Sequence, residues 1–335
     1  MKLLCGTIAA LACLAAPAVA TARADVDAGG SRLAVVPPAE TAIFYYAWFG
    51  TPAADGAYQH WQQGGSAPPA AVGSSFYPVR GAYSSSDALV LGAQMQEIAR
   101  AGVRTVIVSW WGRGSTEDAR LPRVAEAARA AGLGVAVHLE PYGGRTVATT
   151  ASDVDHLRAL GISDFYVWAS VDLPDDEWRE LNGRLDGVRL FANTNLPGKA
   201  AAGGFDGVYT YDVLLYDGRF FPRYCAQARR LRLLCAPSVG PGYDARRATP
   251  DTRLRPRFGG STYDAMWQGA IRSRADVVTI TSYNEWHEGT QIEPARAVPG
   301  YEGYEGAWGR SGAAAETAYL DRTAFWSAQY AARAR

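Results

Sequence analysis

Eight short apolar runs, rich in β-branched and aromatic residues, recur along the chain with helix-like segments between them. These runs are residues 42–48, 104–110, 134–140, 164–169, 188–193, 207–211, 233–238 and a last run that ends at Tyr283. Strands that alternate with helices pair in parallel through right-handed crossovers, and eight such strands close a barrel. The pattern therefore predicts an α/β fold, a single (β/α)8 TIM barrel. An open doubly wound sheet is the alternative.

Two features favour the barrel over the open sheet. No G-x-G-x-x-G sequence follows the first run, as a dinucleotide-binding sheet would require. Polar or aromatic residues stand where the runs end: Trp48, Trp110, Trp111, Glu140, Tyr142, Trp168, Asn193, Asn195, Tyr211, Asp212, Tyr243, Asn284 and Glu285. Active sites of barrels lie at the carboxyl ends of the strands. We therefore expect the site at that end.

The connection between the first two runs is the longest in the chain. Connections of this length are functional or disordered, and the aromatic residues in 55–61, 74–78 and 81–87 argue against disorder. The next helix is predicted to begin near Asp87, whose side chain can cap it. Its apolar spacing runs through Leu89, Leu91, Met95 and Ile98.

Length and charge limit the possible partners. The chain has 335 residues, of which 48% are hydrophobic, so one large domain can bury a full core. Lys+Arg and Asp+Glu each number 33, which gives no net field toward nucleic acid or an anionic membrane. We expect a neutral partner, no nucleic acid, no membrane and a monomeric protein.

The amino-terminal residues are typical of a secretory signal peptide. Met1-Lys2 is followed by an alanine-rich apolar stretch, and cleavage is predicted after Ala20 or Ala24. A buried N-terminal helix is the alternative. The predicted organisation is a signal peptide at 1–24, a lead-in at 25–41 and a catalytic domain at 42–335 of a secreted protein.

Export would remove Cys5 and Cys13 and leave Cys225 and Cys235 in an oxidising compartment. The spacing of these two cysteines suits a helix that faces the next strand. Helix and strand layers are usually too far apart for easy bridging, however, and both residues could be small buried apolar groups. A disulfide and two free thiols both remain open.

The segment T-S-Y-N-E-W-H-E-G-T-Q-I-E, residues 281–293, places Glu285 and Glu288 directly after a buried run. Hydrolysis of a glycosidic bond needs an acid for the leaving oxygen and a second group that acts at the anomeric carbon. Paired carboxylates normally fill these roles. Burial by Trp286 and His287, with the charge of the second glutamate, could keep one acid protonated. Structural hydrogen bonding at the barrel rim is the alternative.

Other chemistries have weaker support. Glu140 could anchor a sugar hydroxyl, or it could be structural. His138 with Glu140 and His287 with Glu288 could form a metal site, but neither pair has the H-E-x-x-H arrangement. No G-x-S-x-G elbow of a serine hydrolase is present. We therefore do not expect a metal site.

Several segments together resemble glycoside hydrolase family 99, the endo-α-1,2-mannosidases and endo-α-1,2-mannanases. The similarity covers most of the chain after the signal peptide. Its ordered matches are residues 44–48, Asp55-Gly56 with His60-Trp61, 73–78, 83–85, 109–111, 138–142, 204–211, 238–243 and 281–293.

The resemblance implies a (β/α)8 barrel that cleaves α-mannosidic linkages internally with retention and without a cofactor. It implies that Glu285 is a base for the 2-hydroxyl of the reacting sugar and that Glu288 protonates the leaving oxygen. The sugar would pass through a 1,2-anhydro species, which departs from the usual covalent carboxylate route. The substrate-binding residues that it implies are Tyr46, His60, Trp110, Glu140, Tyr243 and Asn284.

Three departures from the family pattern concern the substrate more than the chemistry. The stretch between Tyr142 and Phe165 is short, and the segment after Tyr211 diverges. Trp168-Ala169 replaces a frequent Tyr-Asp, and Ala57 replaces a common Lys. Two alternatives therefore stand beside an endo-α-mannosidase: a non-catalytic carbohydrate-binding protein on the same barrel, and an endo-glycosidase for another α-linked glycan.

Overall fold

A parallel sheet that closes on itself forms the centre of the computed structural model, which describes residues 40–333. Its nine strand segments occur in the order β8-β7-β6-β5-β4-β3-β1-β12-β9. Their bounds are β1 (Glu40–Tyr45), β3 (Thr105–Trp110), β4 (Gly134–Leu139), β5 (Asp164–Val167), β6 (Arg189–Asn193), β7 (Gly207–Tyr209), β8 (Leu234–Ala236), β9 (Ser238–Val239) and β12 (Val277–Ile280).

The barrel closes through one interrupted strand. Only Pro237 separates β8 from β9, and proline has no N–H to donate to a neighbouring strand. Because β8 pairs with β7 while β9 pairs with β12, residues 234–239 act as a single barrel strand. The nine segments therefore make eight strands. The predicted (β/α)8 barrel is confirmed, and each predicted run overlaps one of its strands.

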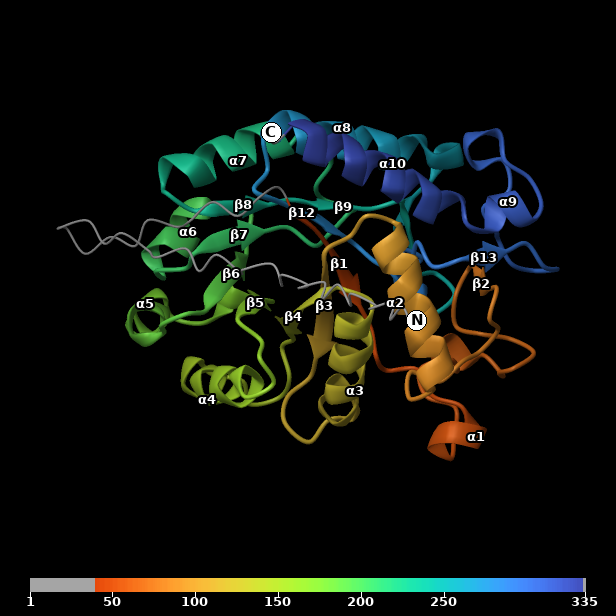
Figure 1. The fold of residues 1–335 in the computed structure, drawn as a ribbon, viewed down its shortest axis with the longest axis horizontal. Coiled ribbons are helices and arrows are strands. Elements are labelled where there is room, and N and C mark those ends of the chain that lie inside the picture. The colour runs from red at the N-terminus through yellow and green to blue at the C-terminus, as the bar shows by residue number, and fades with distance from the viewer. Residues whose placement is uncertain (1–39, 334–335) are drawn as a thin grey trace, which may run out of the picture. The chain divides into compact units, whose positions relative to one another are not determined.

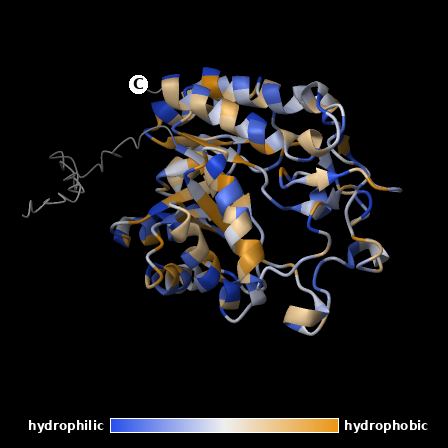
Figure 2. Cartoon of the chain, turned by 45° about the vertical axis from the view of Figure 1, so that its right-hand side comes forward, coloured by the Kyte–Doolittle hydropathy of each residue, from blue (hydrophilic) through white to orange (hydrophobic). Residues whose placement is uncertain are grey.

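Helices cover the outside of the barrel (Figure 1). They are α2 (Ala88–Arg100), α3 (Thr116–Ala130), α4 (Val147–Arg158), α5 (Asp175–Arg184), α6 (Pro197–Ala202), α7 (Phe221–Arg230), α8 (Ser261–Ser273) and α10 (Ala318–Arg333). Helix α10 contacts both α8 and α2, so it completes the outer layer after the last strand. Figure 2 shows apolar strands inside this layer and polar residues on its outer surface. No described helix combines the length and the apolar character needed to cross a membrane.

Short helices and strands outside the central sheet lie in the loops of the barrel. They are α1 (Pro52–Asp55), α9 (Ala313–Glu316), the antiparallel pair β2 (Tyr77–Pro78) with β13 (Ala295–Arg296), and the antiparallel pair β10 (Tyr243–Asp244) with β11 (Leu254–Arg255). The β2–β13 pair joins the long first connection to the residues just after the 281–293 segment. The long connection is therefore tied to the segment that carries the two glutamates.

The predicted start of α2 is confirmed, because the Asp87 side chain accepts a hydrogen bond from the Leu89 N–H at 2.8 Å. Of the four apolar residues in the predicted spacing, Leu91, Met95 and Ile98 are buried and Leu89 is not. Leu89 is 85% exposed, while Gln94 is buried beside Met95. A helix turns about 100° per residue, so Leu89 lies about 200° from Leu91 and faces away from the strands.

The predicted signal peptide, residues 1–24, and the lead-in up to residue 39 lie outside the described residues. Glu40 and Thr41, which the sequence analysis placed in the lead-in, belong to β1.

Cys225 of α7 and Cys235 of β8 form a disulfide. Both residues are fully buried. Of the two possibilities left open by the spacing, the structure contains the bridge. It links a helix to the strand that closes the barrel.

Loss of this bridge should destabilise the protein. A disulfide that closes a loop of this size restricts the unfolded chain, so the double variant Cys225→Ala/Cys235→Ala should lose about 2–4 kcal/mol of unfolding free energy. Urea denaturation followed by circular dichroism would measure the loss. Wild-type protein unfolded and refolded in reductant should behave like the variant. Equal stability of oxidised wild type and variant would contradict the assignment.

Candidate active site

Residues 281–293 form a tight return at the carboxyl end of β12. The Ser282 N–H donates to the Thr290 carbonyl at 3.0 Å, and the Glu293 N–H donates to the Tyr283 carbonyl at 2.8 Å. A single 3₁₀ turn, Trp286–Glu288, lies between these two arms. The return therefore places Glu285 and Glu288 at opposite ends of one short turn.

The buried carboxylate of Glu293 fixes this return to the rest of the barrel. It is fully buried, and its two oxygens accept four hydrogen bonds. The donors are Arg80 Nη1 at 3.1 Å, Tyr83 OH at 2.7 Å, Gln94 Nε2 at 2.8 Å and Trp286 Nε1 at 2.9 Å. They come from the long first connection, from α2 and from the turn itself. A buried carboxylate needs such donors, so the network sets the position of the turn.

Asn284 joins the return to the end of β1. Its Oδ1 accepts from the Tyr46 N–H at 2.8 Å, and its Nδ2 donates to the Tyr46 carbonyl at 2.9 Å. The same Nδ2 donates to Tyr83 OH at 3.2 Å. Asn284 is fully buried. The structure therefore brings two predicted site residues, Tyr46 and Asn284, together, and the asparagine holds the tyrosine backbone beside Glu285.

Glu285 is buried and held by a tyrosine pair. Its Oε2 accepts a hydrogen bond from Tyr211 OH, and Tyr211 OH lies 2.5 Å from Tyr46 OH. The backbone N–H of Glu285 donates to Ser282 Oγ at 2.8 Å. Burial raises the pKa of Glu285 to about 7, although the bond from Tyr211 favours the charged form. Near neutral pH this group can therefore both take up and release a proton.

Glu288 is held in its protonated form more strongly than Glu285. Burial raises its pKa well above the usual value, and the negative charges of Glu285, Asp212 and Glu140 raise it further. Two carboxylates so close cannot easily ionise together. The pair therefore consists of a proton donor, Glu288, and a group near its titration point, Glu285.

Tyr243 and Glu140 border the two glutamates. The pKa of Tyr243 is raised by burial and then by the charge of Glu288, and its hydroxyl donates to Asp251 Oδ2 at 2.8 Å. Glu140 is buried and accepts from Ser109 Oγ at 2.7 Å. Its charge raises the pKa of both catalytic candidates.

His60 lies beside the turn in a stack of aromatic rings. Its ring is 4.6 Å from that of Trp48 with an interplanar angle of 9°, and 5.7 Å from that of His287. His287 Nε2 lies 2.9 Å from the His60 carbonyl. Burial lowers the pKa of both histidines to about 4, so both rings are neutral near pH 7. The stack shapes one side of the turn without adding charge.

Trp110 does not share the position of the other predicted residues. Successive side chains of a strand point to opposite faces. Because Ser109 points inward to Glu140, Trp110 points outward, and its indole N–H donates to Asp118 at 2.9 Å. The ring is fully buried and has no surface with which to contact a sugar, whereas its neighbour Trp111 is 38% exposed. The aromatic contact expected of Trp110 therefore fits Trp111 better.

Three residues of this arrangement had no role in the sequence analysis. Tyr211 was noted only as a strand-end residue, and Arg80 and Glu293 were not considered. The sequence did offer one signal for Tyr211, because this residue stands at the end of a predicted strand. Nothing in the sequence pairs Arg80 with Glu293, which lies 213 residues further along the chain.

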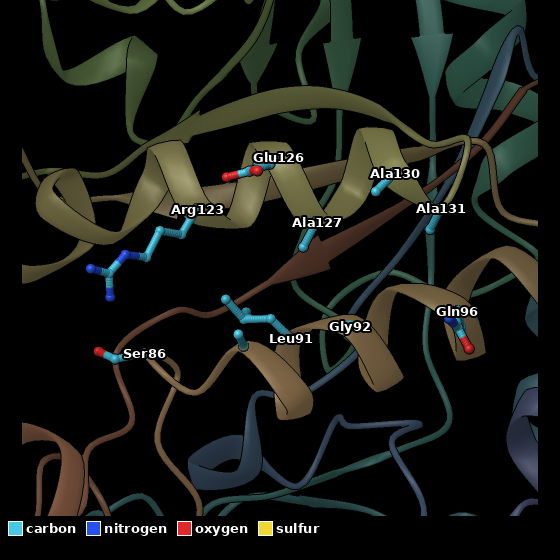
Figure 3. A pocket seen from close by; sticks show the side chains of 10 residues that line it. Ser86, Leu91, Gly92, Gln96, Arg123, Glu126, Ala127, Ala130 and Ala131 are labelled. Atoms are coloured by element: carbon cyan, nitrogen blue, oxygen red, sulfur yellow. The ribbon is translucent and has the colours of Figure 1, made fainter.

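The groove in Figure 3 is separate from these residues. It has a volume of about 540 Å³ and lies between α2 and α3 on the outside of the barrel. Leu91, Gly92, Ala127 and Ala131 are among its lining residues, and no predicted site residue lines it. Within residues 40–333, no three His, Cys, Asp or Glu side chains gather as a metal site.

A closed parallel barrel with two interacting glutamates beyond a strand end is an arrangement that glycoside hydrolases use. Residues 39–332 match the model of glycosyl hydrolase family 99. The chain therefore belongs to this family, as its sequence motifs indicated.

Relatives and solved structures agree with this assignment. The glycoprotein endo-alpha-1,2-mannosidase-like protein of Danio rerio is 32% identical over 316 residues, covering 77% of this chain and 71% of the relative. The glycoprotein endo-alpha-1,2-mannosidase of Xenopus laevis is 31% identical, covering 86% and 76%. The structure of the GH99 endo-alpha-mannosidase from Bacteroides thetaiotaomicron superposes with a TM-score of 0.77 at 28% identity, covering 88% of this chain and 98% of that chain.

Replacement of Glu285 should stabilise the protein in a pH-dependent way. Burial raises its pKa from 4.5 to about 7, so ionisation costs stability as pH rises from the unfolded pKa to about 7, and the cost is constant above that. Glu285→Gln keeps an acceptor for Tyr211 and removes this cost. We expect a gain of about 1–3 kcal/mol at pH 8 and almost none at pH 4.5.

Thermal unfolding at the two pH values would test this expectation. Glu126→Gln, an exposed change on α3, serves as the control and should have no effect at either pH. Equal destabilisation by Glu285→Gln at both pH values would show that burial does not raise the pKa of Glu285 as described above.

Proposed function

We propose that the protein is an exported, retaining endo-glycosidase that hydrolyses α-mannosidic linkages, α-1,2 linkages in particular, in mannan or mannose-containing glycans. The observation that carries the proposal is the single turn that holds Glu285 and Glu288 with unlike proton affinities. The names of the relatives, which are endo-α-1,2-mannosidases, support the linkage. The apolar amino-terminal stretch supports export.

In the first step, Glu285 removes the proton from the 2-hydroxyl of the reacting sugar. The freed oxygen attacks C1, and the bond from C1 to the leaving oxygen breaks. Glu288 gives its proton to that oxygen, and a 1,2-anhydro sugar results. A raised pKa suits Glu288 as the acid, and a pKa of about 7 suits Glu285 as a base near neutral pH.

In the second step, Glu288, now ionised, removes a proton from a water molecule that attacks C1. The C1–O2 bond opens, and Glu285 returns its proton to O2. Both glutamates recover their starting states, and two displacements at C1 retain the configuration. The hydroxyl of Tyr211 stabilises the charged form of Glu285, which keeps its pKa from rising further.

A different α-linked glycan is the second candidate substrate. The observation that favours it lies at the end of β5, where Trp168-Ala169 replaces a Tyr-Asp pair that is frequent in the family. Ala169 has a left-handed backbone with φ 47°, and Arg145 Nη2 donates to the neighbouring Trp168 carbonyl at 2.6 Å. The other arm of the guanidinium donates to the Glu140 carbonyl at 3.0 Å. Arg145 thus ties two strand ends where the chain departs from its family.

Glu288→Gln should abolish hydrolysis. The amide cannot protonate the leaving oxygen, so release of reducing ends from α-1,2-linked mannan should fall by about 10²–10⁴-fold. A reducing-sugar assay with mass analysis of the products would measure the loss. Glu126→Gln makes the same substitution at an exposed position of α3 and should keep full activity. Full activity of Glu288→Gln would refute the assigned role.

Trp111→Ala should weaken substrate binding without unfolding the protein. A ring that stacks on a sugar contributes about 1 kcal/mol, so KM should rise about fivefold while kcat changes little. Because Trp111 is exposed, the free energy of unfolding should change by less than about 0.5 kcal/mol. Trp110→Ala should instead cost about 3–5 kcal/mol of stability. An unchanged KM in Trp111→Ala would remove it from the substrate path.

A further inference from the structure

Arginines gather at the end of the barrel opposite the turn that carries Glu285 and Glu288, which is called the catalytic turn below. Barrel helices run antiparallel to the strands, so their carboxyl termini share the end where the strands begin. Most of these helices end with a basic residue, which complements the helix dipole. The ends of helices α7 and α8 carry more basic residues than are needed to complement the helix dipole. Their ends hold Arg229, Arg230, Arg232, Arg272 and Arg274, here called the basal arginine cluster.

Arg229 joins the two helix ends that carry the basal arginine cluster, and its charge partly offsets the rise that burial causes in the pKa of Asp276. Arg229 Nη1 donates to the carbonyls of Ser273 at 2.9 Å and Arg274 at 3.1 Å, which joins the two helix ends. All five side chains are exposed, and among the described residues none forms an ion pair with a carboxylate.

Carboxylates at the same end of the barrel already have partners. Asp276 accepts from the Cys235 N–H at 2.8 Å, and Asp206 accepts from the Leu190 N–H at 2.8 Å. Asp164 is paired with Arg189. Asp164 and Arg189 offset each other, and the five arginines of the cluster outnumber Asp206 and Asp276, so this end of the barrel carries a local excess of positive charge.

Two arginines of the cluster occupy strained backbone positions. After the five preceding helices, the first left-handed residue is a glycine: Gly102, Gly132, Gly161, Gly187 and Gly204. After α7 and α8 it is Arg232, with φ 60°, and Arg274, with φ 54°. Glycine adopts this conformation at no steric cost, whereas an arginine does not. Backbone strain at the exposed residues Arg232 and Arg274 suggests that their side chains have a function.

An apolar groove adjoins the cluster. It has a volume of about 450 Å³, and its lining includes Leu196, Pro197, Arg230 and Leu231. Leu196 is 58% exposed and Leu231 is 43% exposed, although both are large apolar side chains. Guanidinium groups bind phosphate well, and exposed leucines gain from contact with acyl chains. An anionic polysaccharide would satisfy the arginines but would leave the leucines in water.

We propose that the basal arginine cluster, with Leu231 and the adjoining groove, docks this protein on an anionic phospholipid surface with the catalytic turn facing away. The sequence-based expectation of no membrane contact rested on the neutral total charge, which does not describe this end of the barrel. The proposal is independent of the glycan that the enzyme cleaves.

Co-sedimentation with vesicles would test the proposal. The wild-type protein should bind vesicles of equal parts phosphatidylcholine and phosphatidylglycerol, and should not bind pure phosphatidylcholine. Binding should weaken at 1 M salt, where the screening length falls from about 10 Å to about 3 Å. The triple variant Arg232→Gly/Arg272→Gln/Arg274→Gly should bind about 100-fold more weakly.

The variants also separate docking from folding and catalysis. Glycine relieves the strained backbone at 232 and 274, so the triple variant should unfold at or above the wild-type temperature. Its activity on a soluble glycan should be unchanged. The control Arg123→Gln/Arg219→Gln/Arg223→Gln removes the same charge elsewhere and should bind vesicles within about threefold of wild type.

Three results would overturn the proposal. They are no binding of the wild-type protein to anionic vesicles, an equal loss of binding in the control variant, and binding to a soluble anionic polysaccharide such as heparin without binding to vesicles. If the wild-type protein did not hydrolyse any glycan, the proposed function would be wrong, but the docking proposal would be unaffected.

Discussion

The four hydrogen bonds to the Glu293 carboxylate hold the turn that carries Glu285 and Glu288 in place. Arg80 and Tyr83 come from the long first connection, and Gln94 comes from α2. The fourth donor, Trp286, lies within the turn between the two catalytic candidates. Leaving any of these buried groups without a partner would cost about 1–3 kcal/mol. The long connection is thus a structural support of the site, because it supplies half of the donors that the turn requires.

Burial of the two glutamates lowers the stability of the folded protein, and the same burial gives both groups a raised pKa. Burial makes ionisation of both Glu285 and Glu288 unfavourable, and the charge of Glu285 raises the pKa of Glu288 further. The fold meets this cost through contacts that do not react, such as the paired bonds between Asn284 and Tyr46 and the hydroxyl of Tyr211. The result is one carboxylic acid and one group near its titration point, which ordinary exposed glutamates would not provide at neutral pH.

The barrel was predictable because its determinants are local. Each β-rich run lies on a barrel strand, and the two glutamates follow the last run directly in the chain. The sequence did not show which way Trp110 points, because position at a strand end does not fix direction; Ser109 points inward, so its neighbour points outward. The Arg80–Glu293 pair and the interruption at Pro237 depend on contacts that the folded barrel creates. Total charge likewise gave no sign that arginines concentrate at one end.

In the proposed mechanism Glu285 acts on the 2-hydroxyl of the reacting sugar rather than on its anomeric carbon. Two matched α-1,2-linked mannosides, one with a 2-hydroxyl on the reacting sugar and one with hydrogen in its place, distinguish these two roles. The first should be cleaved with retention, as judged by NMR of the fresh product, and the 2-deoxy compound should be bound but not cleaved. Cleavage of the 2-deoxy compound at a comparable rate, or a sugar ester trapped on Glu285, would contradict it.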